Sequence, residues 1–409
     1  MPRGVAWSLR YSPGMDPLHA LADRAAAPTR WVIGLMSGMS LDGLDVALAR
    51  VEDGDGVRPS VELVAARTFP YGIERIERLR AAASADVGEI AALDAELAAL
   101  WGEHVLHFLR EVDVEPGQIL AIGSHGQTVF HTPRGRSTNA VTLQIGQGDV
   151  LAHVTGLPVV CDFRPRDIAA GGEGAPLIPL VDWILAGEGA APLAMHNLGS
   201  IANVTICTPS LDDVVAFDTG PANTLIDAAV RSDPAGEVVG GFDRDGTLSA
   251  AGEVDEDLIL QLYMARSAWM AEVPPKSAGY ETFGPPLWRA HEAHWRDLPH
   301  ATRVRTAVEY TALVLRDAYA WHVLTRFPGC ERVRFSGGGC HNPTLMARIR
   351  SLLADLEVEV EVFPSAWIDA KEAVGFALLA DRRLRGEPTN VPGATGASAC
   401  VSSGAIHLP

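Results

Sequence analysis

Short apolar segments near the start of the chain alternate with polar turns, and this pattern predicts β-strands. We expect three of them, at Trp31–Leu35, Asp45–Val51 and Val61–Phe69. The stretch GLMSGMSLDGLD, residues 34–45, joins the first two and is rich in glycine, serine and aspartate. The sequence EDGDG at residues 52–56 follows the second strand. Both compositions are typical of tight turns between neighbouring strands.

An amphipathic helix is expected next. Apolar residues recur at three- and four-residue intervals from Ile90 to Leu109, which is the spacing of one helix face. Asp86 and Glu89 stand three residues apart ahead of this run, as in a capping box. A further strand is predicted at Ile119–Gly123.

The second half of the chain begins with the same plan. Strands are predicted at Leu193–Leu198, Ile201–Cys207 and Val214–Asp218, and a helix at Thr224–Arg231. A strand pair with a glycine-bearing turn, a third strand and a helix thus occur twice. This repetition favours an α/β fold with two related domains.

The last third of the chain alternates between helices and strands. Helices are predicted at residues 301–325, 343–355 and 366–384, and strands at 333–336 and 358–363. The tail from Pro388 is rich in Pro, Gly and Ser, but its apolar residues predict that it packs. We expect a loosely ordered extension at 1–29, one domain at 30–160 with about 385–409, and a second domain at 161–384.

Composition narrows the classes of function. The chain has 409 residues and a formal net charge of -18, which disfavours nucleic acids and anionic membranes as partners. Five cysteines are scattered without a CxxC pair, which fits a reducing cytoplasm better than a disulfide framework or a zinc site. No apolar run approaches the roughly 18 residues of a membrane span. We therefore expect a cytoplasmic enzyme with a small-molecule substrate; a homodimer is the candidate assembly.

Three glycine-bearing loops, at residues 34–45, 197–203 and 336–342, are candidates for anion binding. Loops without side chains can present consecutive backbone N–H groups to a phosphate. The alternative is that each loop is only a tight turn. A GxxxxGK[ST] loop is absent from the sequence, which excludes a P-loop. Asp42 and Asp45 favour the functional interpretation, because a carboxylate beside a phosphate is where Mg²⁺ binds.

Polar residues after two predicted strands suggest a site for sugar hydroxyls. His125 and Gln127 follow the strand at Ile119–Gly123, and Asp162 and Arg164 follow the apolar residues 158–160. Side chains at the carboxyl ends of strands line a crevice in α/β folds. Ordinary polar loops remain the alternative. A metal site at His125 and His131 is disfavoured, because no carboxylate or cysteine stands at ligand spacing.

Asp218 ends a predicted strand in the sequence FDTGPAN. Such a position is rigid and suits a general base, although an aspartate before Thr-Gly-Pro can equally be a helix cap. Glu372 stands near the start of the last predicted helix and is either a site residue or a solvated first-turn acid.

Taken together, these segments resemble the anhydro-N-acetylmuramic acid kinase family. The resemblance spans residues 31–409 and consists of blocks in the family's order, namely GLMSGMSLDGLD, GSHGQTVFH, TLQIG, DFRPRDIAAGGEGAPLIP, NLGSIANVT, FDTGPAN, PKSAGYETF, SGGGCHNP, DAKEAVGFA and TGAS. It implies the actin/hexokinase-like fold, with two ribonuclease-H-like domains and the active site in the cleft between them.

The resemblance also implies a reaction and a set of site residues. The reaction opens the 1,6-anhydro bridge of 1,6-anhydro-N-acetylmuramic acid and phosphorylates O6 with ATP and Mg²⁺, in cell-wall sugar recycling. Asp218 matches the family's general base. His125, Gln127, Asp162 and Arg164 are expected on the sugar side, and Asp42 and Glu372 on the magnesium side. The residues expected at the nucleotide are Gly38, Met39, Ser40, Leu41, Asp42, Gly43, Leu44, Asp45, Gly199, Gly337, Gly338, Gly339 and Asn342.

The chain departs from the family pattern at several positions, namely Met39, Gln147, Ser200, Ala222, Tyr280 and the pair Cys340-His341. None of these changes touches Asp42, Asp218 or the GGG block, so kinase chemistry is expected to remain. The departures leave the preferred sugar open. A kinase for a different anhydrosugar such as levoglucosan is one alternative, and a non-catalytic nucleotide-gated switch of the actin-like fold is another.

Overall fold

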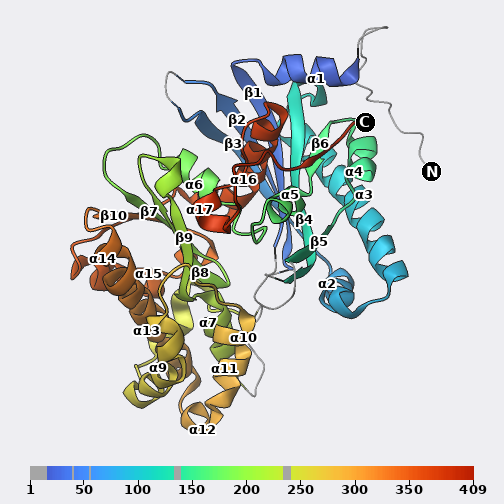
Figure 1. The fold of residues 1–409 in the computed structure, drawn as a ribbon. Helices are drawn as coiled ribbons and strands as arrows, with labels where there is room; N and C mark the ends of the chain where they lie inside the picture. Colours follow the sequence, from blue (N-terminus) through green and yellow to red (C-terminus); the bar gives the residue numbers. More distant parts are fainter. Residues whose placement is uncertain (1–15, 39–40, 55–56, 133–139, 234–240) are drawn as a thin grey trace. The chain divides into compact units, whose positions relative to one another are not determined.

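The computed structural model describes residues 16–38, 41–54, 57–132, 140–233 and 241–409. The chain divides into two compact units (Figure 1). The first unit comprises the residues up to Glu188 together with Ala370–Pro409, and the second comprises Gly189–Asp369. Each unit is built on one mixed β-sheet with its own apolar core.

The sheet of the first unit has the strand order β12-β6-β4-β1-β2-β3, and β5 pairs with β4. The first three strands form an antiparallel meander, and β4 and β6 then add in parallel beside β1. The strands are β1 (Thr29–Ser37), β2 (Gly43–Glu52), β3 (Ser60–Pro70), β4 (Ile119–Thr132), β5 (Val141–Ile145), β6 (Val159–Cys161) and β12 (Ala405–His407).

The sheet of the second unit has the order β11-β10-β7-β8-β9. Here too an antiparallel meander comes first, and β10 and β11 add in parallel beside its first strand. Its strands are β7 (Leu193–Leu198), β8 (Ile201–Cys207), β9 (Val215–Pro221), β10 (Arg332–Ser336) and β11 (Glu359–Val362). The five strands β7 to β11 therefore repeat the connectivity of β1, β2, β3, β4 and β6. This confirms the duplicated plan expected from the sequence.

Helices cover both sheets. In the first unit they are α1 (Pro17–Ala25), α2 (Ile73–Ala81), α3 (Val87–Glu111), α4 (Gly148–Thr155), α5 (Phe163–Ala169), α6 (Pro179–Leu185), α17 (Pro392–Thr395) and most of α16 (Ser365–Leu384). In the second they are α7 (Asn223–Val230), α8 (Thr247–Ala251), α9 (Glu256–Ala271), α10 (Tyr280–Phe283), α11 (Pro285–Ala290), α12 (Glu292–Trp295), α13 (His300–Ala318), α14 (Leu324–Arg326) and α15 (Pro343–Ala354). Among the described residues, no helix combines the length and the apolar character that crossing a membrane requires.

Helix α16 packs very closely on the sheet of the first unit (Figure 1). A Cβ placed on Gly34 of β1 would lie 1.7 Å from the carbonyl oxygen of Ala373, and one on Gly123 of β4 would lie 2.0 Å from that of Phe376. Both contacts are with helix backbone, so no side-chain rotation could relieve them. Glycine at these two positions lets α16 lie directly against β1 and β4, which fixes the position of Glu372 on the same helix.

The unit boundaries differ from the expected ones, because residues 161–188 and 370–384 belong to the first unit. Asp167 explains part of this: it accepts hydrogen bonds from Asn390 Nδ2 at 2.7 Å and Thr395 Oγ1 at 2.8 Å, and so ties α5 to the C-terminal tail. The buried pair of Lys371 Nζ and Asp182 Oδ1, 2.9 Å apart, ties α16 to α6. These long-range contacts are not visible in local sequence patterns.

The expectation of a loose extension at residues 1–29 is wrong for its described part. Residues Pro17–Ala25 form α1, with Asp16 as the N-cap and a proline in the first turn. Leu21 and Ala25 are buried, and Arg24 Nη2 donates to the carbonyl oxygen of Ile119 at 2.6 Å. The helix therefore packs beside β4. The Asp-Pro pair was the sequence signal for its start.

The capping box expected before α3 is half present. Asp86 accepts from the backbone N–H of Glu89 at 2.9 Å, as a cap does. The Glu89 carboxylate instead accepts from Arg78 Nε at 2.8 Å. Arg78 also binds Glu96, so α2 and α3 are joined by one arginine between two glutamates.

The tail from Pro388 packs as expected, with Val391 buried and β12 paired to β6.

Candidate active site

The first glycine-rich loop joins β1 to β2, and the two strands are paired up to Met36 and Asp45. Met39 and Ser40 lie outside the described residues. Leu41 has a φ of 57°, and its N–H donates to the carbonyl oxygen of Gly38 at 3.3 Å. Asp42 is exposed at the end of the loop. Its position fits a carboxylate that could hold a partly hydrated Mg²⁺.

Three residues predicted to bind the nucleotide have structural roles at the base of this loop. Gly43 is packed against β3, where a Cβ would lie 2.5 Å from the carbonyl oxygen of Phe69. Leu44 is fully buried in the core. Asp45 accepts a hydrogen bond from Thr68 Oγ1 at 2.5 Å across the sheet. The part of the loop that can face a ligand is therefore shorter than expected.

Gln127 lies against the same loop. Its Oε1 accepts from Ser37 Oγ at 2.6 Å, and its Nε2 donates to the carbonyl oxygen of Gly38 at 3.4 Å. Ser37 Oγ is 2.7 Å from Tyr71 Oη, which accepts from Trp101 Nε1 at 2.9 Å. Burial raises the pKa of Tyr71 to about 12, so the phenol stays protonated in this chain of hydrogen bonds. Sequence reasoning did not single out Ser37, although it lies in the GLMSGMSLDGLD segment, and it missed Tyr71 and Trp101, which no motif marks as site residues.

His125 and Arg164 form a second group in the first unit. Arg164 Nη1 donates to the carbonyl oxygen of Gly174 at 2.8 Å, and Nη2 lies 2.8 Å from His125 Nε2. Since a guanidinium can only donate, His125 Nε2 is the acceptor and the imidazole is neutral. Burial first, and the charge of Arg164 second, lower the pKa of His125 to about 3. The structure thus brings two of the expected sugar-side residues into direct contact.

Two donors of this pair lack a regular hydrogen bond. Arg164 Nε and His125 Nδ1 are buried and have no partner of normal geometry in the described part of the chain, although backbone groups of Ser37 and Gly126 lie near the imidazole. A buried donor without an acceptor costs about 1–3 kcal/mol. Such groups occur where a water or ligand completes the site.

Glu372 lies on α16 close to Arg164 and Lys371, whose charges act on its carboxylate. Burial nevertheless raises its pKa overall. Burial thus outweighs the attraction of these cations, and Lys371 is itself paired with Asp182. The proximity of Glu372 to Arg164 fits a carboxylate that positions this arginine, and its role as a ligand of Mg²⁺ stays a prediction.

Asp162 is not part of the pair formed by His125 and Arg164. Its carboxylate lies beside Cys161 and near His407, at the edge of the sheet where β12 pairs with β6. The sequence could not predict this, because the strand that contributes His407 comes from the distant C-terminus.

In the second unit, the glycines expected at the nucleotide come together around the turn after β7. A Cβ on Gly337, whose φ is 88°, would lie 2.4 Å from Asn197 Oδ1, and one on Gly339 would lie 2.7 Å from Leu198 Cβ. Gly338 has more space, since its Cβ would meet Asn223 Nδ2 at 3.7 Å. Gly199 joins this cluster through its carbonyl oxygen, which accepts from the N–H of Asn223 at 3.0 Å.

Asn342, also expected at the nucleotide, caps helix α15. Its Oδ1 accepts from the N–H of Leu345 at 3.0 Å, and its Nδ2 donates to Asp243 Oδ2 at 3.1 Å. Asp243 further accepts from Ser249 Oγ at 2.5 Å. Both ends of the Asn342 amide are therefore used in holding the loop that precedes α15.

Asp218 lies at the middle of β9, which continues to Pro221 and does not end at Asp218 as expected, and it is half-buried. Its Oδ2 accepts from the N–H of Ala278 at 2.7 Å, and its own N–H donates to the carbonyl oxygen of Lys276 at 3.0 Å. Burial raises the pKa of Asp218 to about 6, against the opposing effect of the Ala278 N–H. The carboxylate is thus ionised at neutral pH but basic enough to take a proton, as a general base requires.

Neighbouring side chains hold β9 in place. His196 lies between Tyr319 Oη and Thr219 Oγ1, at 3.0 Å from each. Thr219 follows Asp218 directly, so this buried group fixes the backbone that carries the carboxylate. Sequence reasoning missed it, and also missed the role of Ala278, which is a backbone contact.

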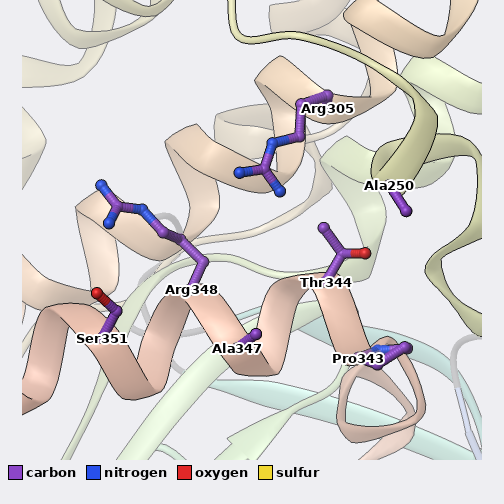
Figure 2. A pocket seen from close by; sticks show the side chains of 7 residues that line it. All are labelled: Ala250, Arg305, Pro343, Thr344, Ala347, Arg348 and Ser351. Atoms are coloured by element: carbon purple, nitrogen blue, oxygen red, sulfur yellow. The ribbon is translucent and has the colours of Figure 1, made fainter.

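A separate surface pocket of the second unit is lined by Ala250, Arg305, Pro343, Thr344, Ala347, Arg348 and Ser351 (Figure 2). Arg348 Nε donates to both carboxylate oxygens of Glu309, at 2.8 and 2.9 Å. Arg305 lies 3.7 Å from the same carboxylate. None of the residues expected at the nucleotide or the sugar lines this pocket.

Comparisons with known proteins agree with the resemblance seen in the sequence. A family model described as anhydro-N-acetylmuramic acid kinase matches residues 30–409. A protein of that name from Gloeobacter violaceus is 40% identical over 380 residues, which are 92% of this chain and 98% of the relative. Another, from Salinibacter ruber, is 38% identical over 408 residues, which are 97% of this chain and all of the relative. A solved ROK family glucokinase from Streptomyces griseus is similar over 85% of this chain and 98% of its own, with 16% identity and a TM-score of 0.33. The match along nearly the whole chain, with relatives of almost equal length, shows that this chain belongs to the anhydro-N-acetylmuramic acid kinase family.

Proposed function

We propose that this protein is an ATP-dependent kinase that opens the 1,6-anhydro bridge of 1,6-anhydro-N-acetylmuramic acid and phosphorylates O6. Family membership supports this activity and this substrate. The structural observation that carries it is Asp218, a half-buried carboxylate on β9 with a pKa of about 6. A switch or scaffold would have no need of a base tuned in this way.

The proposed reaction begins with Asp218 as general base. Asp218 accepts a proton from a water molecule, whose oxygen forms a bond to the anomeric carbon C1. The bond between C1 and O6 breaks, and O6 keeps the electron pair. O6 then attacks the γ-phosphorus of ATP, and the bond from that phosphorus to the bridging oxygen breaks to release ADP. The proton stays on Asp218 until it leaves to solvent.

The nucleotide contacts that we propose are the backbone of Gly38 and Asp42 in the first unit and the cluster of Gly199 and Gly337–Gly339 in the second. Glycines in these loops allow backbone N–H groups to approach phosphate oxygens closely. Asp42 is the proposed carboxylate for Mg²⁺. When bound with ATP, the ion offsets charge on the β- and γ-phosphate oxygens.

The sugar contacts that we propose are His125 and Arg164. The buried Arg164 Nε–H has no partner among the described residues and is suited to an oxygen acceptor on the sugar, and the neutral imidazole of His125 adds no charge of its own. Gln127 contacts the first glycine-rich loop through Ser37 and Gly38.

Replacing Arg164 with Lys is expected to raise KM for the sugar by about tenfold to a hundredfold, with a smaller change in KM for ATP. Lysine keeps the charge, but its three N–H groups share one nitrogen and cannot reach Gly174, His125 and the sugar from the separate positions of Nη1, Nη2 and Nε. Steady-state kinetics with each substrate varied would measure both constants. Arg166→Lys is the matched control on the same helix and should leave both unchanged; equal effects of the two substitutions would contradict the role of Arg164.

The pH profile should report Asp218. We expect kcat/KM for the sugar to fall about tenfold per pH unit below about pH 6, because the base must be ionised and its pKa is about 6. Initial rates between pH 4.5 and pH 8 at saturating ATP would show this step. The control is an Asp218→Asn variant, whose residual activity should show no fall of kcat/KM below about pH 6. A wild-type profile that stays flat down to pH 5 would exclude Asp218 as the base.

An isotope experiment tests the proposed chemistry directly. With 1,6-anhydro-N-acetylmuramic acid and ATP in H₂¹⁸O, the sugar phosphate should gain one ¹⁸O at C1 and none in the phosphoryl group. Mass spectrometry with fragmentation distinguishes the two positions, and N-acetylmuramic acid 6-phosphate incubated in H₂¹⁸O for the same time corrects for exchange of its anomeric oxygen with solvent. Label in free inorganic phosphate without any sugar phosphate would indicate a nucleotide hydrolase and would contradict the proposal.

A further inference from the structure

The C-terminal strand β12 brings His407 next to Cys161. The strand pairs antiparallel with β6, with Ala405 opposite Cys161 and His407 opposite Val159. Residues two apart on a strand share a face, so Cys161 and His407 are diagonal neighbours on the same side of the sheet. Asp162 follows Cys161 directly. Three potential metal ligands of different types thus meet at one sheet edge.

The geometry of these three side chains suits a common ligand. One ligating atom from each of Cys161, Asp162 and His407 lies within 4.8 Å of the other two. Cys161 is buried, His407 is half-buried and Asp162 is exposed, so the group is reached from solvent on one side. Across the described residues, this is the one group of at least three Cys, His, Asp or Glu side chains that meets this criterion.

A second observation concerns the ring of His407. Its Nδ1 lies 2.8 Å from Asp149 Oδ1, and its Nε2 is buried without a hydrogen-bond partner in the described chain. A carboxylate at one ring nitrogen and a metal at the other is the usual arrangement of a ligating histidine. Gly148 makes room for the ring, because a Cβ there would lie 2.7 Å from Nε2.

Carboxylates lie close to the group, and Arg166 and Arg383 line the surface pocket beside Asp162. Asp94 is close enough to act electrostatically on both Cys161 and Asp162, and Asp149 lies on the far side of the imidazole. On binding a divalent ion, Cys161 would coordinate as the thiolate and its proton would leave to solvent.

We propose that Cys161, Asp162 and His407 bind one divalent transition-metal ion of borderline softness, such as Zn²⁺, with water as the fourth ligand. A thiolate together with an imidazole selects such an ion over Mg²⁺ or Ca²⁺, which prefer oxygen. The site is separate from the magnesium expected with ATP. Its effect is structural, because it joins the C-terminal strand to β6. Sequence spacing gave no sign of it, since the ligands meet only through the pairing of β12.

The test uses the full chain after removal of metals with a chelator under reducing conditions. Zn²⁺ is added in the presence of a chromophoric chelator, and thermal unfolding is followed in parallel. We expect one Zn²⁺ per chain and a rise in Tm of several degrees. Cys161→Ala and His407→Asn should each weaken binding at least tenfold and remove the rise in Tm. In the His407→Asn variant, the asparagine amide can still donate to Asp149, as Nδ1 of the histidine does, while Nε2 is removed.

Cys330→Ala and Cys400→Ser serve as controls. The first removes another buried thiol and the second an exposed one, and neither should change Zn²⁺ binding. Replacing Zn²⁺ by Co²⁺ gives an independent readout that does not depend on a stable variant, because thiolate ligation produces a charge-transfer absorption in the near ultraviolet. Absence of that band in wild-type protein, absence of Zn²⁺ binding, or equal binding by wild type, Cys161→Ala and His407→Asn would overturn the proposal.

Discussion

Asp218→Asn is expected to reduce kcat for sugar phosphorylation by about 10²–10⁴, the range that a general base contributes. The same change should leave the affinity for ATP within a few fold, because the hydrogen bond from the N–H of Ala278 can be accepted by the asparagine oxygen. Single-turnover rates of sugar phosphate formation and a fluorescent nucleotide titration would measure the two quantities. Turnover close to that of wild type would exclude Asp218 as the base.

The same substitution should make the protein more stable at neutral pH. Burial raises the pKa of Asp218 from 3.8 to about 6, so the folded state holds this proton more tightly than the unfolded state does. The contribution of this proton to the free energy of unfolding is fully present below about pH 4 and is lost as the pH rises through about 6. At pH 8 the ionised Asp218 carboxylate therefore lowers the free energy of unfolding of the wild type by about 1–3 kcal/mol, a range that allows for its partial exposure. The neutral side chain of asparagine removes this cost.

Thermal unfolding at several pH values would check this sign. We expect the Tm of the Asp218→Asn variant to exceed that of wild type at pH 8, and the difference to shrink between about pH 6 and pH 4. Catalytic groups commonly reduce stability in this way. A variant that is less stable than wild type at pH 8 would mean that the carboxylate is stabilised by its surroundings, and would contradict the raised pKa.

Gly34→Ala is expected to destabilise the first unit by about 3 kcal/mol or more, or to prevent folding. The added Cβ would lie 1.7 Å from the carbonyl oxygen of Ala373 and 2.8 Å from the N atom of Ala377, both in the backbone of α16. The helix would have to move away from β1, and Glu372 would move away from Arg164 with it. Urea unfolding would measure the loss of free energy.

Gly117→Ala is the matched control for this prediction. It lies in the same unit, and a Cβ there meets no atom within 4 Å. Its free energy of unfolding should stay within about 0.5 kcal/mol of wild type. If Gly34→Ala were as stable as Gly117→Ala, the backbone of α16 could not lie against Gly34 of β1 as closely as the 1.7 Å distance requires.

Much of the fold could be predicted because its elements are strongly periodic. The strands Leu193–Leu198 and Ile201–Cys207 were predicted with the bounds that the structure gives to β7 and β8. Their apolar patterns are continuous, and glycine or proline marks the turns beside them. Helix α1 was missed because its apolar face is short and its start, Asp16-Pro17, is a single capping signal.

The site was less predictable, because it depends on contacts between distant residues. Local sequence placed His125 and Arg164 just after two strands, whereas His125 lies within β4 and Arg164 within α5, and only the fold brings Arg164 Nη2 to 2.8 Å from His125 Nε2. Asp162 was grouped with them because it follows the apolar residues 158–160, as Arg164 does. Its carboxylate lies instead beside Cys161, at the end of β6 that pairs with β12.

Sugar-dependent turnover of ATP is the most direct test of the central claim that the protein phosphorylates an anhydrosugar. ADP release would be measured with no sugar, with 1,6-anhydro-N-acetylmuramic acid and with levoglucosan, and the sugar phosphate would be identified by mass spectrometry. We expect 1,6-anhydro-N-acetylmuramic acid to stimulate ADP release and to yield N-acetylmuramic acid 6-phosphate in equal amount, with kcat/KM far above that for levoglucosan. A preference for levoglucosan would contradict the proposed substrate, and ADP release that no anhydrosugar stimulates would contradict the kinase activity itself.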